Sequence, residues 1–211
     1  RMVLEAAKLA MPNTKVVDEN GNPLIVYHGT SADFNVFDEN YSSANTGAKN
    51  ATLGFYFTPL RSYAEKIAKG DSKVIKSVFL NIQNPLGLGY AKKFDGSYHN
   101  GREAKPFNYE DSKNIVDGLA VIRDAVTKKF GSYTKENVSK WKSLVESYYD
   151  GIYVMTGDTE DFMKTLIPSM QYIAFYPSQI KSADAVTYDD DGNVIPLSER
   201  FNPENEDIRF R

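Results

Sequence analysis

The sequence predicts a single α+β domain, in which short strands alternate with amphipathic helices. A chain of 211 residues is long enough for one domain with a substantial buried core. Short runs of β-branched and aromatic residues, bounded by Gly, Pro, Asn and Asp, are typical of strands. Longer stretches with apolar residues at helical spacing lie between these runs and indicate helices.

The N-terminal quarter contains a predicted helix, a hairpin and a loop. A leading helix is expected at Val3–Leu9, within a leading segment that covers residues 1–14. An Asn-Gly pair at 20–21 separates two β-branched runs, which predicts a hairpin over residues 16–27. Residues 39–52 are rich in Ser, Asn, Gly and Ala, which is typical of a loop.

The next segments predict two strands that flank a helix. Residues 53–57 form the first strand, and Thr58 then acts as N-cap of a helix that has Pro59 in its first turn. This helix is expected to run to about Lys69 and to end at Gly70. A second strand is predicted over residues 74–82, and residues 87–106 have an irregular pattern.

The second half of the chain begins with two amphipathic helices, which form an insertion at about 108–149. Strands follow at 151–155 and 171–175, with a loop between them. A hairpin at 185–195 completes a domain assigned to residues 15–195. The remaining residues, 196–211, form a polar tail that is expected to wrap the surface or lead into a linker.

Composition excludes several kinds of site. The chain has no cysteine, which removes disulfides, thiolate nucleophiles and Cys-based zinc sites. The formal net charge of −3 argues against affinity that depends on non-specific phosphate contacts, so a protein partner is favoured over nucleic acid. No apolar run approaches the ~20 residues that a membrane helix needs. Neither a phosphate-binding loop nor a dinucleotide glycine pattern is present.

Three separated motifs carry the residues with chemical potential. They are Tyr27-His28-Gly29-Thr30, then Gly54-Phe55-Tyr56-Phe57-Thr58, and finally Gln171-Tyr172-Ile173-Ala174-Phe175 with Ser178-Gln179-Ile180 after it. In this order they resemble the three motifs of ADP-ribosyltransferases of the diphtheria-toxin and poly(ADP-ribose) polymerase type. The segments Gln179–Ala183 and Phe201–Phe210 resemble the domains of this kind in polyvalent proteins of phages and conjugative elements.

The resemblance implies an ADP-ribosyltransferase-like split β-sandwich around an NAD cleft, with an inserted helical pair. NAD is then the substrate, and no metal is required. In the first motif, His28 is implied to hydrogen-bond a hydroxyl of the adenosine ribose. Gly29 is implied to bring its backbone amide and carbonyl to the nicotinamide carboxamide. Thr30 matches the hydroxyl residue that follows His-Gly in the polymerase group.

The second motif implies a stacking platform for nicotinamide. Tyr56 takes the place of the tyrosine that stacks on the cationic ring. The Ser-x-x-Tyr of the polymerase group falls on Ala64 and Ile67, and Ser62 and Tyr63, one helical step away, are the candidate substitutes. The implied NAD-binding residues are therefore His28, Gly29, Thr30, Tyr56, Ser62, Tyr63 and Ile67.

Gln171 matches the catalytic glutamate of the polymerase group, a position that is often glutamine in the domains of polyvalent proteins, and His28 and Tyr56 complete the implied catalytic set. The glutamate bonds the 2′-hydroxyl of the nicotinamide ribose and steadies the cationic transition state. A glutamine keeps the shape and one acceptor atom but lacks the charge. A unit charge at ~4 Å contributes at most ~4 kcal/mol at an effective dielectric constant of ~20, or about three orders of magnitude in rate.

These residues predict mono-ADP-ribosyl transfer from NAD to a macromolecular acceptor, by an effector or toxin domain that acts in the bacterial cytoplasm. Ser169 stands where arginine-modifying relatives have a second glutamate, so arginine is not supported as the target. The loop Gly157–Met170 is implied to select the acceptor. Two alternatives remain, an NAD glycohydrolase and a non-catalytic module that binds NAD or a protein.

Overall fold

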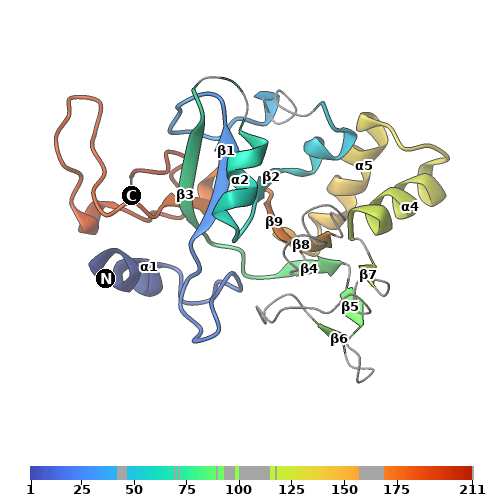
Figure 1. Cartoon of the computed structure of the whole chain (residues 1–211), viewed down its shortest axis with the longest axis horizontal. Coiled ribbons are helices and arrows are strands. Elements are labelled where there is room, and N and C mark those ends of the chain that lie inside the picture. Colours follow the sequence, from blue (N-terminus) through green and yellow to red (C-terminus); the bar gives the residue numbers. More distant parts are fainter. Residues whose placement is uncertain are drawn as a thin grey trace.

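A computed structural model describes residues 1–41, 47–68, 70, 72–88, 90–92, 98–99, 115–116, 118–156 and 169–210. It confirms the α+β class, because two main sheets pack together with helices beside them (Figure 1). Within these residues, no helix is both long and apolar enough to cross a membrane. The described α-helices are α1 (Met2–Ala10), α2 (Arg61–Ile67), α4 (Gly118–Phe130) and α5 (Lys135–Val145).

The strands form two main sheets and a small third one. The first sheet has the antiparallel order β1 (Val26–Thr30), β3 (Val74–Leu80), β10 (Ile180–Ser182). The second has the order β2 (Phe55–Phe57), β9 (Ser169–Ala174), β8 (Gly151–Thr156), β4 (Pro85–Leu88), in which β4 pairs with β8 in parallel. The third consists of β6 (Tyr98–His99), β5 (Tyr90–Lys92) and β7 (Ile115–Val116).

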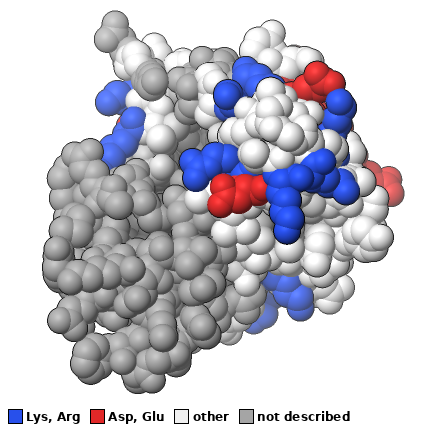
Figure 2. All heavy atoms as spheres, turned by 90° about the vertical axis from the view of Figure 1, so that its right-hand side faces the viewer, with Lys and Arg blue, Asp and Glu red and all other residues white. Residues whose placement is uncertain are grey.

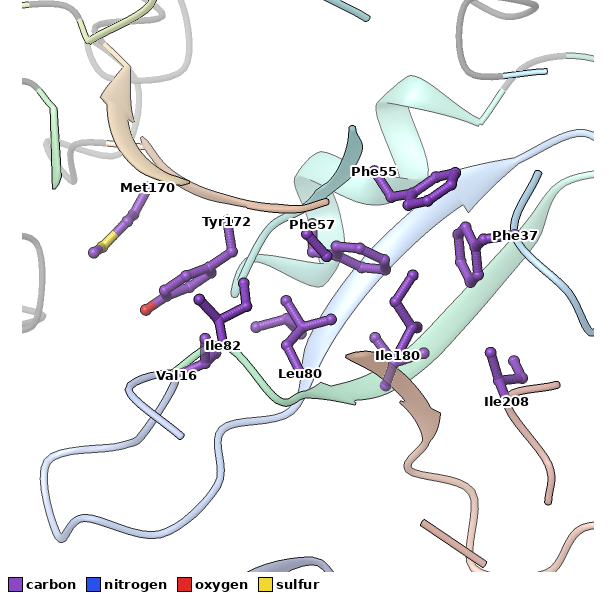
Figure 3. Packing of buried hydrophobic residues seen from close by; sticks show 13 residues of the cluster. Val16, Phe37, Phe55, Phe57, Leu80, Ile82, Met170, Tyr172, Ile180 and Ile208 are labelled. Atoms are coloured by element: carbon purple, nitrogen blue, oxygen red, sulfur yellow. The ribbon is translucent and has the colours of Figure 1, made fainter. Parts of the chain in front are cut away.

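The core between the two main sheets follows from side-chain alternation along the strands. Phe55 and Phe57 of β2 point toward the first sheet, where they join a cluster with Leu80 and Ile180 (Figure 3). The intervening Tyr56 packs with a different cluster, on the opposite face of the second sheet. The alternation therefore places Tyr56 and its flanking phenylalanines in separate layers.

The helical insertion covers the outer face of the second sheet. Ile122 and Val126 of α4, together with Val138 of α5, are fully buried against Ile152 and Ile173. The helices lie where the apolar spacing predicted them, although residues 108–114 and 117 of the predicted insertion are outside the described chain. The second sheet is thus buried on both faces, by the first sheet and by the insertion.

The side chain of Gln179 ties the two sheets together. Its Oε1 accepts from the backbone N–H of Phe175 at 3.0 Å and of Tyr176 at 2.9 Å, just beyond β9. Its Nε2 donates to the carbonyl of Asn81 at 3.2 Å, after β3, and to the carbonyl of Asp150 at 2.8 Å, before β8. The amide therefore uses both of its donors and its acceptor to join backbone segments from both sheets.

Several predicted element boundaries were wrong. α2 begins at Arg61, because Thr58 pairs with Tyr27 of the first sheet instead of starting the helix, and α2 ends at Ile67. The turn at 18–22 is present, but the strand after it pairs with β3 and leaves only a bridge between Val17 and Pro23. The irregular stretch 87–106 contributes to β4, β5 and β6 in its described part.

The C-terminal segment packs against the first sheet. The N–H of Ser182 donates to the carbonyl of Ile208 at 2.8 Å, and Ile208 is buried. Arg200 donates to the carbonyl of Ser182 at 2.9 Å, and Lys181 donates to the carbonyl of Asn205. Residues beyond 195 therefore contribute to the core as well as to the surface.

Replacing Gln179 with leucine is expected to lower the free energy of unfolding by at least about 3 kcal/mol, because each buried group left unpaired costs about 1–3 kcal/mol. Urea unfolding measures this loss. Gln83→Ala is the matched control, since Gln83 is exposed and its side chain bonds only one other side chain in the described structure. Equal losses in the two variants would contradict the role given to Gln179.

Burial of Lys181 makes a pH-dependent contribution to stability. Burial lowers the pKa of Lys181 to about 8, against the opposing attraction of Asp207. An unfolded lysine titrates near ~10.4, so between about pH 8 and 10.4 the unfolded state binds more protons than the folded state. Relative to a Lys181→Met variant, the protein should gain stability as pH rises through this window, by at most about 1.4 kcal/mol per pH unit. Urea titrations at several pH values measure the difference, and a flat difference would contradict the depressed pKa.

Candidate active site

A cavity of about 670 Å³ lies where β1, β2 and α2 meet. This volume is in the range of small-molecule sites, about 300–1,000 Å³. The cavity brings together residues from all three sequence motifs, although these are far apart in the chain. The predicted site residues that line it are His28, Gly29, Thr30, Tyr56, Tyr63, Ile67 and Gln171.

Gly29 allows α2 to approach β1 closely. A Cβ atom at this position would lie 1.9 Å from the carbonyl oxygen of Ala64, which is backbone and cannot move aside independently of the helix. The strand and the helix therefore meet at a contact that only glycine permits. The structure gives Gly29 a packing role in addition to the NAD contact that the resemblance implies.

The His28 side chain is fixed by the neighbouring strand. Its Nδ1 lies 2.8 Å from the carbonyl oxygen of Tyr56, and because a carbonyl only accepts, Nδ1 must carry the proton. In the neutral ring, Nε2 is then an acceptor, suited to the hydroxyl of a ribose. Burial lowers the pKa of His28, against the bond to Tyr56, and Lys76 lowers it further. His28 is therefore neutral at neutral pH.

Aromatic rings hold His28 in place. The ring centroid of Phe37 lies 5.1 Å from that of His28, edge-on, and the ring centroid of Phe57 lies 5.5 Å away. Phe34 contacts both His28 and Phe37 in the same edge-on manner. These contacts give the imidazole an apolar surround, which accounts for its preference for the neutral form.

Tyr56 presents a neutral phenol at the cavity. Its hydroxyl donates to the carbonyl of Asn50 at 2.8 Å, in the 3₁₀ turn η2 (Lys49–Leu53). Burial raises the pKa of Tyr56, with a smaller contribution from Tyr133, so the hydroxyl stays protonated at neutral pH. The ring is held from both ends, by β2 and by this bond, as a stacking surface requires.

Gln171 enters the cavity from β9 and contacts α2. The residue is only 8% exposed, and its Nε2 lies 3.3 Å from the hydroxyl oxygen of Tyr63, to which it donates. In this orientation Oε1 is the atom of the amide that accepts a hydrogen bond from a ligand. An amide that donates on one side and accepts on the other can position a ribose hydroxyl but supplies no net charge.

The orientation of α2 decides which of its residues reach the cavity. Tyr63, Ala64 and Ile67 line it, as expected because Ile67 lies four residues after Tyr63 and three after Ala64 on the helix. Ser62 is exposed and lies outside the described lining. Of the two candidate substitutes for the family's serine and tyrosine, the structure therefore brings only Tyr63 to the site.

Part of the cavity wall was not predicted from the sequence. Phe34, Phe37 and Tyr41 line the cavity from a segment with no periodic pattern, and the only signal was their aromatic character among polar neighbours. Leu119 of α4 also lines it, from the helical insertion, which contains none of the three motifs. Among the described lining residues, Asp38 is the only Asp, Glu, Lys or Arg, so few charged side chains face the cavity.

Some predicted features are outside the described chain. The acceptor-selecting loop falls mostly on residues 157–168, which the structure does not describe. Within the residues described, no group of three or more His, Asp or Glu side chains is placed to hold a metal ion. The absence of a metal requirement stays a prediction.

Comparison with protein families identifies the class to which this fold and cavity belong. The sequence matches the family described as ADP-ribosyltransferase in polyvalent proteins over residues 18–189, which is most of the chain. The chain therefore belongs to this family, as the resemblance predicted. Membership implies NAD as the substrate. Searches among curated proteins and among solved structures gave no match.

Gly29→Ala is expected to destabilise the protein even without NAD, by more than about 3 kcal/mol, because the added methyl overlaps a backbone carbonyl. Urea unfolding in the absence of ligand measures this. Gly21→Ala is the control: its Cβ meets open space and the cost is confined to the φ of +78°, about 1–2 kcal/mol. Unchanged stability with weakened NAD binding would leave Gly29 with a binding role alone.

Proposed function

We propose that this chain transfers a single ADP-ribosyl group from NAD to a macromolecular acceptor. The supporting observation is the cavity, which is lined by residues from all three motifs on which the resemblance to ADP-ribosyltransferases rests. His28, Tyr56 and Gln171 reach it from three different strands, β1, β2 and β9. Residues 28 and 171 are far apart in the chain and line one cavity because the two sheets that carry them pack together.

The proposed reaction breaks the bond between the ribose C1′ and the nicotinamide nitrogen. Nicotinamide leaves as a neutral molecule with the bonding electron pair, so the reaction needs no general acid for the leaving group. A nucleophilic atom of the acceptor forms the new bond to C1′ and loses its proton to solvent. Catalysis then depends on holding nicotinamide and supporting the positive charge that develops on the ribose.

Each residue has a role that fits its geometry. His28 accepts from a hydroxyl of the adenosine ribose through Nε2, since Nδ1 is engaged with Tyr56. Tyr56 supplies the stacking surface, and its hydroxyl is already used by Asn50. Gln171 accepts from the 2′-hydroxyl of the nicotinamide ribose through Oε1 while Tyr63 holds the other end of the amide.

The neutral Gln171 favours slow transfer to a single site over polymer formation. Elongation in the polymerase group depends on the glutamate that this chain lacks. The acceptor we propose is a protein, modified in the cytoplasm of a bacterial host by an effector or toxin delivered by a phage or another mobile element. Membership of the polyvalent-protein family supports this setting.

The proposal is tested by nicotinamide release and by transfer of label from adenylate-labelled NAD to host protein. His28→Ala should lower nicotinamide release at least tenfold, because it removes the imidazole and with it the proposed hydrogen bond to the adenosine ribose. Gln171→Glu should raise release, by up to about 10³-fold, because a charge worth at most ~4 kcal/mol now faces the ribose. Ser143→Ala, an exposed change on α5, is the control that should have no effect.

The outcomes separate transfer from the alternatives. Label on protein supports transfer, whereas free ADP-ribose alone indicates an NAD glycohydrolase. Binding of NAD without any nicotinamide release, even with Gln171→Glu, indicates a non-catalytic module. Unchanged release after His28→Ala would show that the site is assigned to the wrong residues.

A further inference from the structure

The helical insertion carries a charge opposite to that of the whole protein. The chain has a net charge of −3, yet cations predominate on the surface formed by α4, α5 and the adjoining η2. Figure 2 shows Lys and Arg side chains gathered on the described part of this face, with few Asp and Glu between them. The exposed cations of this basic face are Lys49, Arg123, Lys128, Lys129, Lys135 and Lys140, and its exposed anions are Asp124 and Glu136.

The basic face begins at the wall of the cavity. Lys49 of η2 lies 6.0 Å above the ring of Tyr133, in the turn between α4 and α5. The next residue, Asn50, lines the cavity and accepts from the Tyr56 hydroxyl. Leu119, in the first turn of α4, also lines the cavity. A molecule bound along the insertion therefore lies next to the site of ribose chemistry.

We propose that the basic face docks an acidic segment of a protein acceptor beside the cavity. This inference rests on the proposed function, because a docking surface serves an enzyme that modifies a macromolecule. Complementary charge accelerates encounter and fixes orientation at such surfaces. It also brings a nucleophile of the acceptor to a cavity that is itself almost uncharged in its described part.

Two observations favour a protein over a nucleic acid. Both exposed anions lie among the cations: Arg123 pairs with Asp124 at 3.6 Å and Lys140 with Glu136 at 2.6 Å. These carboxylates repel the evenly spaced phosphates of a nucleic acid. A protein segment can instead place uncharged polar groups opposite them. In addition, Leu144 is 46% exposed and lies one helical turn beyond Lys140, so the charged stripe continues into apolar surface.

The α5 surface continues in the same direction with Tyr148, which is 76% exposed. Apolar and aromatic side chains are typical of the centre of protein interfaces, charged side chains are typical of the rim, and Tyr is a frequent anchor at the centre. Nucleic acid without exposed bases gains little from Leu144. The basic face thus fits an acidic protein segment that also carries apolar residues.

Binding is tested on the whole chain without NAD, by fluorescence anisotropy at low salt. The probes are a labelled peptide of alternating glutamate and leucine, a peptide of alternating glutamate and serine, and double-stranded DNA of equal charge. The glutamate–leucine peptide should bind most tightly. The double variant Lys128→Glu, Lys129→Glu should weaken binding of this peptide about tenfold or more, since complementary surface charges accelerate association. Leu144→Ser should weaken binding of the glutamate–leucine peptide and leave binding of the other two probes unchanged.

The control is the pair Lys15→Glu and Lys73→Glu, which makes the same change in net charge at exposed positions outside the insertion. This pair should not alter binding. Tighter binding of DNA that is insensitive to Leu144→Ser would overturn the proposal in favour of a nucleic-acid surface. Absence of binding by every probe would also overturn it. Nicotinamide release is measured separately on the same variants and should be unchanged, so loss of the activity and loss of docking are distinguishable.

Discussion

The buried amide of Gln179 is the interaction on which the geometry of the site depends. It joins the end of β9 to segments that follow β3 and precede β8, and these belong to different sheets. β3 carries β1, and hence His28, by direct pairing, while β9 carries Gln171. The distance between the two residues is therefore fixed by a contact outside the cavity. A second tie, between Tyr27 and Thr58, holds β1 against β2 and orients Tyr56.

The same arrangement explains why the cavity is neutral. His28 is surrounded by aromatic rings that disfavour its charged form, and burial disfavours ionisation of Tyr56. Gln171 adds an amide, which has no charge. Each residue contributes orientation and hydrogen bonds, and none contributes a full charge. Under the proposed function, such a site holds NAD by shape and hydrogen bonds, and it supports the developing positive charge less well than a glutamate would.

Part of this organisation was predictable from sequence because it is encoded locally. The motif around His28 ends a strand, and the alternation in 55–57 sends Tyr56 to one face and its neighbours to the other. Gln179 was recognised only by its spacing from Gln171, and its role as a clamp required the three-dimensional structure. Four backbone partners from three chain segments leave no periodic pattern in the sequence.

The start of α2 shows why other parts were not predictable. A cap-like Thr58 followed by proline predicts a helix at once, but the backbone of Thr58 is occupied by Tyr27, so the helix starts at Arg61. Which residues of a short helix face a cavity depends on how it packs, here on the contact between Gly29 and Ala64. The sequence therefore left Ser62 and Tyr63 equivalent, and packing distinguished them. Long-range contacts of this kind override local propensity.

Net charge is misleading for the same reason, since a sum over the chain hides its distribution. The acidic total argues against affinity that depends on non-specific phosphate contacts, yet the described helices of the insertion concentrate cations on one surface next to the cavity. The two faces of the insertion have different roles. Its buried face, through Ile122, Val126 and Val138, covers the sheet that carries Gln171, and its exposed face carries the charge. Under the proposals made above, the insertion therefore positions the strand that holds NAD and also binds the acceptor. One element would then align both reactants, NAD and the acceptor.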